Sequence, residues 1–487
     1  MAFATVKIKI FITALILQTL PLCALGQQAG LTGATLPNGG VRWTSAEWSA
    51  VLGLDANIYG YAMRGTWWGL SRVPAPDFDT NKNWAEVWLH PRLNVTYNLS
   101  DNRIAYAGLS YGLTRDLGGN AFDYWNQGAA EIENAFIGYR SGTREKGFWD
   151  ISVGSQPLML GTGMLLATGA VNGAEWGNAA SSKRSAWKNS AIVRAGFDNL
   201  TVQGFWLQPR EPNSIRSDTT IIGGSIEWQA IDSSRAGIAF LHVPSSKYFY
   251  PGDAAPFAFI EQGRQGLNVY HGWSDLKGPL GLLEQLSVRG EFAIEQGNVT
   301  RVTGQRSAMQ AHAWFAGMSY HFDKLPFAPR LSYGFAYFSG NKPGSDTYGR
   351  FDPMYYGNGL DNWWFGANGA YAYLNTNVQF NRVTLDLYPT QQDIIKFQFL
   401  NAQVAQIGSP IQFGQSGQFR DGNFVVGPQQ KGLSNELMLQ YVRLISPTII
   451  FSTYVTYSIP GDAIKEMNTN GVASNWMTVG AGLSWSF

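Results

Sequence analysis

The chain has 487 residues, a formal net charge of +1 at pH 7 and a mean hydropathy of −0.14. Its length would suit several soluble domains, yet the sequence beyond its first residues has no helical period, no break in composition and no linker. The near-neutral charge gives no indication of a nucleic-acid partner. Aromatic residues at 14% and a total of 56 glycines are typical of a barrel with an apolar outer face and a polar lumen.

The first residues predict a secretory signal peptide covering 1–26. Lys7 and Lys9 precede an apolar run, and small residues stand at the expected cleavage site near Gly26. The apolar run is too short to be a comfortable membrane anchor. Cleavage would remove Cys23, the single cysteine, so we expect a mature chain without disulfides or cysteine metal ligands. Residues 27–50 are expected to form a periplasmic segment, and residues 51–487 the barrel.

Strands can be recognised from there by alternation of apolar and polar side chains. Residues 89–99 alternate in this way, and so do residues 105–113. The short turn Ser100-Asp101-Asn102 separates the two segments. We therefore predict an antiparallel hairpin.

Tight turns and long connections alternate along the rest of the chain. Tight turns are expected at 197–199, 232–234, 323–326, 388–392 and 446–447. Long connections are expected at roughly 155–188, 243–264, 340–370, 405–433 and 460–474. Outer-membrane barrels have this asymmetry, with short periplasmic turns and long extracellular loops. The predicted fold class is therefore all-β, as a transmembrane antiparallel β-barrel of about 18 strands with both termini on the periplasmic side.

The last stretch, residues 471–487, makes the most specific prediction. From Met477 onward large apolar residues alternate with glycine, serine and threonine, as expected for a strand between lipid and a wet lumen. A soluble protein of two or three sandwiches would show the same alternation, but it needs neither the terminal aromatic Phe487 nor the difference between turns and loops. The C-terminal strand ending at Phe487 is the segment that we expect the barrel-assembly machinery to recognise, and outer-membrane lipid is the expected partner of the outer face.

No motif predicts an enzyme. The five histidines have no metal-ligand spacing, and none accompanies a Gly-x-Ser-x-Gly elbow. We expect neither a catalytic residue nor a cofactor nor a metal. The histidines are His90, His242, His271, His312 and His321.

Charged residues on the polar side of the strands are the candidate pore-lining residues. An arginine facing lipid at mid-membrane costs about 2–4 kcal/mol, so alternation predicts that these side chains face the lumen. They brace the wall as salt bridges, or they form a positive constriction that selects anions. Arg194, Arg289 and Arg382 are the strongest candidates, because they lie near the middle of well-defined strands. The basic members are Arg92, Arg194, Arg289, Arg330, Arg382 and Lys396, and the acidic members are Glu227, Glu291, Glu295, Asp386 and Glu436.

Aromatic residues fall into two groups. Those predicted on the outer face are expected to form the girdles at the membrane interfaces. Those in loops pack the loops or, as a second possibility, stack on sugar rings. The first group is Trp273, Trp314, Tyr320, Phe322, Tyr333 and Tyr457, and the second is Tyr355, Tyr356, Trp363 and Trp364.

Several segments carry a shared pattern: Gly154-Ser155-Gln156, 176–178 with 184–194, 199–209, 266–270, and Tyr337-Phe338-Ser339-Gly340 with 349–353, which contains Phe351-Asp352-Pro353. Together they resemble the alginate-export family of outer-membrane barrels. The resemblance implies a single large barrel that exports a polyanionic polysaccharide through an arginine-lined pore. Ser155 stands where the family pattern has arginine.

The leading hypothesis is an outer-membrane channel that passes a polysaccharide or an anionic saccharide. The first alternative is a general or carbohydrate-selective uptake porin, which paired lumen charges would favour over an unpaired arginine ring. The second is a barrel that does not conduct and serves as a surface enzyme or a binding scaffold.

Overall fold

The computed structural model describes residues 40–487 with short gaps, and the following statements concern those residues. The gaps are 68–77, 172–174, 179, 182–183, 231–233, 252–258, 261–262, 279–282, 302–303, 358–365, 412–417, 421–422, 426 and 468–472. The predicted signal peptide lies outside the described residues, as do Trp363 and Trp364. None of the described helices is both long enough and apolar enough to cross a membrane.

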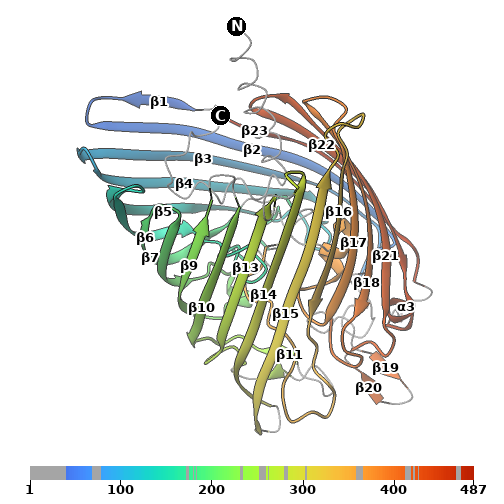
Figure 1. Ribbon diagram of the computed structural model, residues 1–487. Coiled ribbons are helices and arrows are strands. Elements are labelled where there is room, and N and C mark those ends of the chain that lie inside the picture. The colour runs from blue at the N-terminus through green and yellow to red at the C-terminus, as the bar shows by residue number, and fades with distance from the viewer. Residues whose placement is uncertain are drawn as a thin grey trace.

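The chain folds as a closed antiparallel β-barrel of 18 strands, which confirms the predicted fold class (Figure 1). One further strand, β1 (Val41–Thr44), pairs only with β2. The barrel strands, in the order in which they follow one another around the wall, are β2 (Trp48–Arg64), β3 (Lys82–Ser100), β4 (Arg103–Gly118), β5 (Gly128–Thr143), β6 (Gly147–Pro157), β7 (Ala186–Phe197), β8 (Leu200–Gln208), β9 (Thr220–Gln229), β10 (Arg235–Ser245), β13 (Asn268–Lys277), β14 (Leu286–Thr300), β15 (Arg306–His321), β16 (Arg330–Phe338), β17 (Val378–Leu387), β18 (Asp393–Val404), β21 (Gly432–Ser446), β22 (Ile449–Pro460) and β23 (Trp476–Ser486).

The barrel closes where β23 pairs with β2. Asp55 to Arg64 of β2 pair with Met477 to Ser486 of β23, and the backbone of Phe487 continues the ladder to Leu54. Strand β1 pairs with residues 49–52 of β2, beyond the end of β23. The first barrel strand thus begins at Trp48, and the described part of 27–50 is already paired to the sheet.

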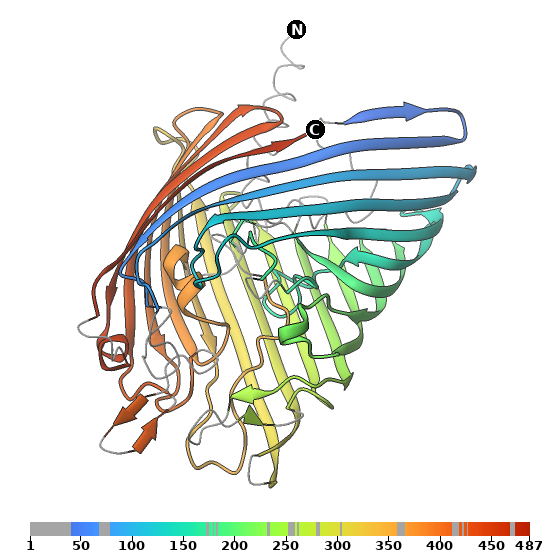
Figure 2. The same cartoon turned by 180° about the vertical axis from the view of Figure 1, so that it is seen from behind.

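The two rims of the barrel differ as predicted. One rim, here called the turn rim, carries short connections such as 101–102, 198–199, 388–392 and 447–448, and both ends of the barrel chain lie there (Figures 1 and 2). The opposite loop rim carries the long connections 158–185, 246–267, 339–377, 405–431 and 461–475. Short elements lie in these loops: η1 (Asn213–Ile215), β11 (Tyr250–Pro251), β12 (Phe259–Ile260), α2 (Gly366–Ala372), β19 (Gln418–Arg420), β20 (Asn423–Val425) and α3 (Asp462–Met467).

Side chains alternate between the outer face and the lumen along each strand. In β15 every second residue from Ala308 to Met318 is exposed outward, and those between are mostly small and buried. The last strand, β23, shows the predicted pattern, with Met477 and Val479 exposed and Thr478 buried. Outward-facing side chains in the span meet lipid, which favours apolar residues there.

One predicted girdle residue is placed differently. Trp273 faces the lumen and is 6% exposed, and its indole N–H donates a hydrogen bond to Glu227 Oε2 at 3.1 Å. The segment Val269, His271, Trp273 and Asp275 mixes apolar and polar residues on one face, so alternation could not identify its inner side. Trp314, Phe322, Tyr333 and Tyr457 are exposed.

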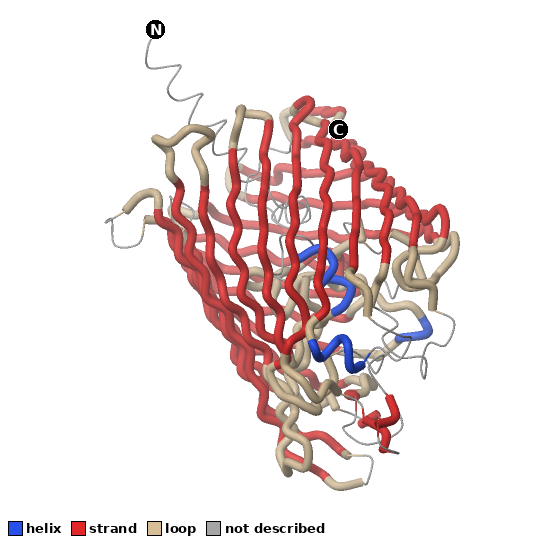
Figure 3. The backbone as a smooth tube through the Cα atoms, turned by 90° about the vertical axis from the view of Figure 1, so that its right-hand side faces the viewer, coloured by secondary structure: helices blue, strands red, loops and turns tan. Residues whose placement is uncertain are grey.

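Loops from the loop rim fold back into the barrel. Figure 2 shows the β6–β7 connection lying within the barrel, and Figure 3 shows helical segments (blue) among the loops. The buried apolar cluster of the protein lies largely where these loops meet the wall, and it includes Leu166, Trp187, Phe351 and Tyr355. The core is therefore inside the lumen, on the side of the loop rim.

Candidate functional site: the lumen

Wall carboxylates hold one part of the β6–β7 loop against β3, β4 and β5. Glu86 accepts hydrogen bonds from the backbone N–H groups of Ala180 (3.1 Å) and Ser181 (2.8 Å). Glu133 accepts two more, from residues 185 and 186 at the end of this loop and the start of β7, at 2.8 and 2.9 Å. Asp116 accepts one from Asn178 at 2.6 Å. These contacts satisfy backbone donors that are removed from water, so they fix the loop.

The other part of the same loop is held on the opposite wall. Glu291 of β14 accepts a hydrogen bond from the backbone N–H of Thr162 at 2.8 Å, and its other oxygen lies 2.7 Å from His271 Nε2. Strand β14 is the ninth strand after β3 in a circuit of 18, so it stands across the barrel from β3. The β6–β7 loop therefore crosses the lumen.

A second loop, between β16 and β17, is anchored through Asp352. The Asp352 carboxylate receives two hydrogen bonds of 2.7 Å from the Arg264 guanidinium and one of 2.8 Å from the Tyr250 hydroxyl. The backbone N–H of Asp352 donates to Glu295 Oε2 on β14 at 2.8 Å. Burial alone would raise the pKa of Asp352, but the charge and hydrogen bonds of Arg264 outweigh burial and hold this pKa below its ordinary value. The buried carboxylate is thus kept charged by its partner.

The same loop is also held by Glu436 of β21. The Glu436 carboxylate accepts hydrogen bonds from three successive backbone N–H groups at the start of α2, those of Ala367 (2.8 Å), Asn368 (3.2 Å) and Gly369 (3.2 Å). It also accepts one from the Ser458 hydroxyl at 3.0 Å. The first backbone N–H groups of a helix have no acceptor within the helix, so the Glu436 carboxylate stabilises α2 by accepting from them.

The two inward loops also contact each other. The backbone N–H of Tyr355 donates to Leu165 at 3.1 Å, and Ala167 donates back to Tyr355 at 2.8 Å. The Tyr355 hydroxyl donates to Glu211 at 3.0 Å, and its ring packs edge-on against Trp187. Tyr355 therefore packs the two loops together, which is the first of the two roles predicted for the loop aromatics. We call the described residues of 158–185, 209–219, 246–267 and 339–377 the loop plug.

Three of the predicted lumen arginines form ion pairs on the part of the wall between the loop plug and the turn rim. Arg92 pairs with Asp55 on β2. Arg194 lies 3.8 Å from Asp150 and donates a 2.7 Å hydrogen bond to Gln203. These pairs join neighbouring strands near the turn rim, so they brace the wall.

The third pair is that of Arg330 and Asp386. Two guanidinium nitrogens of Arg330 donate to Asp386 Oδ2, at 2.8 and 3.0 Å. Asp386 is 1% exposed, and its register partner on the other side is Lys396, which is 5% exposed. Asp386 therefore stands between two basic residues.

The remaining predicted arginines lie on the wall formed by β14 to β18. One row of register partners runs from Arg289 through Gly317 and Gly334 to Arg382. Arg289 is exposed, and no ion pair among the described residues engages it. The two glycines put no side chain into the lumen between the arginines. The next row toward the turn rim is Ser319, Ser332, Thr384 and Gln398.

We call this surface the basic wall. Between Glu291 and the turn rim, the lumen-facing ionisable groups of β14 to β18 include Arg289, Arg330, Arg382 and Lys396 and the carboxylate Asp386. On the adjoining strand β13, Asp275 stands opposite Arg289 in register. Neighbouring strands lie about 4.8 Å apart, so Arg289 and Arg382, three strands apart, are separated by about 14 Å along the wall.

The predicted pore-lining residues thus have different surroundings. Arg92, Arg194, Arg330 and Asp386 form the ion pairs described above, and Glu291 holds a loop. Arg289, Arg382 and Lys396 line the basic wall together with Arg330 and Asp386. Sequence reasoning missed Glu86, Asp116 and Glu133 as loop anchors. Their position at the loop-rim ends of strands, beside long connections, was the available signal.

Histidines do not gather in the described residues. His90 lies 3.4 Å from Asp55, His271 contacts Glu291, and His242 contacts Asn268 at 2.9 Å. Within the same residues no group of three histidine, cysteine, aspartate or glutamate side chains could hold a metal ion.

Comparison with known proteins shows the fold. No family model and no curated protein matches the chain. A BenF-like porin from Pseudomonas fluorescens Pf-5 superimposes with a TM-score of 0.53 at 10% identity, over 90% of this chain and 98% of that structure. A variant of OccD1 (OprD) superimposes with a TM-score of 0.52 at 10% identity, over 90% and 95%. Pseudomonas aeruginosa OpdL superimposes with a TM-score of 0.51 at 9% identity, over 91% and 99%.

The chain therefore has the fold of an outer-membrane porin and is located in the outer membrane, as predicted. The turn rim is periplasmic and the loop rim extracellular. None of these three structures is named as an alginate-export protein, so that resemblance is carried by the sequence segments alone.

Proposed function

We propose that this protein is an outer-membrane uptake channel for small anionic solutes, with saccharide acids and other carboxylates as the substrate class. The observation that carries the proposal is the row Arg289, Gly317, Gly334 and Arg382, which places two arginines on one lumen-facing row, separated by two positions that carry no side chain. Fixed positive charge in a narrow lumen raises the local concentration of anions.

The hydroxyl and amide groups beside the basic wall fit the same substrate class. Ser319, Ser332 and Thr384 occupy adjacent positions one row toward the turn rim. Such groups hydrogen-bond carboxylates and sugar hydroxyls alike. One structural neighbour, OpdK of Pseudomonas aeruginosa, was solved with vanillate, which is a carboxylate.

The loop plug favours uptake of small solutes over export of a polymer. The β6–β7 loop crosses the lumen and is fixed on both walls. Arg92, Arg194 and Arg330 are ion-paired, and paired lumen charges favour an uptake porin over an exporter with an unpaired arginine ring. Polysaccharide export, which the resemblance to the alginate-export family implies, would require the plug to move aside.

Bilayer recordings test the proposal. We expect anion selectivity in the reversal potential under a salt gradient, and block by monomeric uronate. Arg289→Gln and Arg382→Gln should each reduce both, because each removes one charge from the basic wall. Arg306→Gln is the matched control, since Arg306 is exposed on the outward-facing side of β15.

Three outcomes separate the alternatives. Channels without selectivity that ignore uronate would overturn the anion proposal and leave a general porin. Block by oligo-uronate but not by the monomer would instead support the polysaccharide exporter. Absence of any conductance would leave a scaffold or a surface enzyme.

A further inference from the structure

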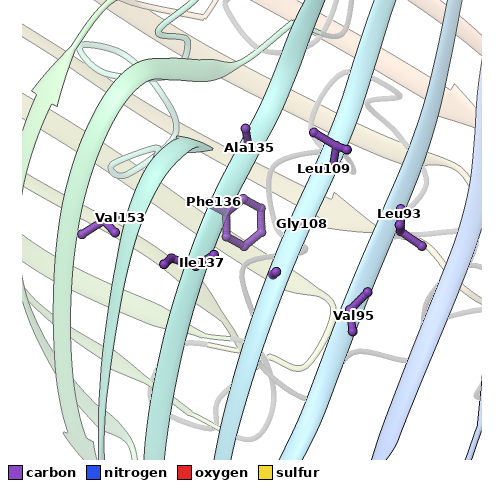
Figure 4. A pocket seen from close by; sticks show the side chains of 9 residues that line it. Leu93, Val95, Gly108, Leu109, Ala135, Phe136, Ile137 and Val153 are labelled. Carbon is purple, nitrogen blue, oxygen red and sulfur yellow. The ribbon is translucent and has the colours of Figure 1, made fainter.

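An apolar groove lies on the outer face of the barrel across β3 to β6. Two adjoining hollows of about 350 and 500 Å³ form it, and Val95, Ala107, Ile137 and Val153 line both. Figure 4 shows the side chains around the first hollow, with Leu93, Val95 and Leu109 on one side of it and Ile137 and Val153 on the other.

The groove exists because its floor has small side chains. Ala105 and Ala107 of β4 point outward between larger residues of β3 and β5. On the same strands, Gly108 and Gly138 are covered from the lumen side by the rings of Phe136 and Tyr106. The outer face is therefore hollowed here by its small side chains, while the two rings close the sheet on the lumen side.

A charged residue stands at the periplasmic end of this groove. Arg103 lies two positions before Ala105 on the outward-facing side of β4, is exposed, and pairs in register with Ser141 of β5. No hydrogen bond or ion pair within the described part of the chain engages its guanidinium group. Ser141 pairs in turn with Trp149 of β6, whose ring lies 5.1 Å from that of Tyr139. The nearby turn also carries the exposed Asp101.

We propose that this groove binds one phospholipid of the periplasmic leaflet, with an acyl chain in the groove and the phosphate against Arg103 and Ser141. The apolar lining fits a chain, and the unengaged guanidinium at the end toward the turn rim complements a phosphate. Tyr139 and Trp149 stand at the same level, where aromatic side chains favour the head-group region. The proposal concerns the outer face and does not depend on what passes through the lumen.

Native mass spectrometry of the full-length barrel with dioleoylphosphatidylglycerol tests it. We expect wild type to retain one lipid under activation that strips the others. Ala107→Trp fills the groove and should abolish this retention. Arg103→Gln should lower it about fivefold, the effect expected for one basic residue near a charged lipid. Ala316→Trp, outward-facing on β15, and Lys324→Gln, exposed in another short turn, are controls that should keep it.

Equal retention by wild type and all four variants would overturn the site and mean only nonspecific annular lipid. Equal retention of dioleoylglycerol, which has the chains but no phosphate, would overturn the role of Arg103. Heat-modifiability in gel electrophoresis shows whether each variant has folded, and Ala105→Phe provides a second way to fill the groove. Channel conductance should be the same in every variant.

Discussion

On the extracellular side of the lumen, wall carboxylates accept hydrogen bonds from loop backbones, whereas on the periplasmic side arginines pair with aspartates of neighbouring strands. Glu86, Glu133 and Glu436 each accept at least two backbone N–H groups from a loop or from its junction with a strand. Arg92 and Arg330, by contrast, contact aspartates of adjacent strands. Carboxylates therefore fix loop segments at one end of the lumen and brace the wall at the other.

The difference has a physical cause. Loops that enter a barrel carry backbone donors away from water, and an ionised carboxylate is a strong acceptor for them. Strands already satisfy their backbone in the ladder, so charged side chains near the turn rim have only one another and water. Among the described residues of the basic wall, cations outnumber carboxylates.

Breaking the pair of Arg264 and Asp352 should have the largest effect. Arg264→Met leaves a buried carboxylate without its cation, a loss of about 3–5 kcal/mol. We expect the β16–β17 loop to leave the lumen, so that single-channel conductance rises. Arg216→Met removes the cation of an exposed pair and should change nothing. Unchanged conductance in Arg264→Met would show that this pair does not hold the plug.

Removing the Glu436 carboxylate should release helix α2 alone. Glu436→Ala leaves three backbone donors without their acceptor, which costs about 1–3 kcal/mol for a buried group of this kind. Amide hydrogen exchange over 366–372 should become faster. Asp275→Ala, on the lumen side of β13, is the control and should leave this exchange as it is. Protection equal to wild type would contradict the anchor role.

Acid should loosen the plug through Asp352. Its pKa in the folded protein lies below the ordinary 3.8, so its contribution to stability is complete above pH 3.8 and is lost as the pH falls through the lower folded value. The change in conductance that depends on Asp352 should therefore be absent at neutral and mildly acidic pH and appear only in stronger acid. Asp352→Asn cannot titrate at this position. If it shows the same acid transition as wild type, another group is responsible.

Loss of a brace should have the smallest effect. Arg330→Gln removes the partly exposed cation of this pair and leaves the buried Asp386 opposite Lys396, so it should lower the free energy of unfolding by roughly 1 kcal/mol. Denaturant titration of the barrel in detergent measures it, with the outward-facing Arg115→Gln as control. Plug exchange over 366–372 should not change. Faster exchange there would mean that the two halves of the lumen are coupled.

Alternation along the chain predicted the strands, the hairpin at 100–102, the contrast between the two rims and the C-terminal strand. These depend on local sequence, because lipid on one side and water on the other impose a period of two on every strand. Trp273 shows the limit of this reasoning, since a loop plug makes part of the lumen apolar and removes the contrast between the faces.

The roles of the lumen charges were decided by the tertiary structure. Alternation indicates that Arg92, Arg289 and Arg382 face inward, but not that Arg92 meets Asp55 while the other two lie on either side of Gly317 and Gly334. Those relations depend on the register between strands distant in sequence and on a loop that crosses the barrel. The sequence by itself determined the barrel and its orientation in the membrane, because each strand alternates between side chains that suit lipid and side chains that suit the lumen. Only closure of the barrel determined which charges are paired, which hold loops and which face the lumen.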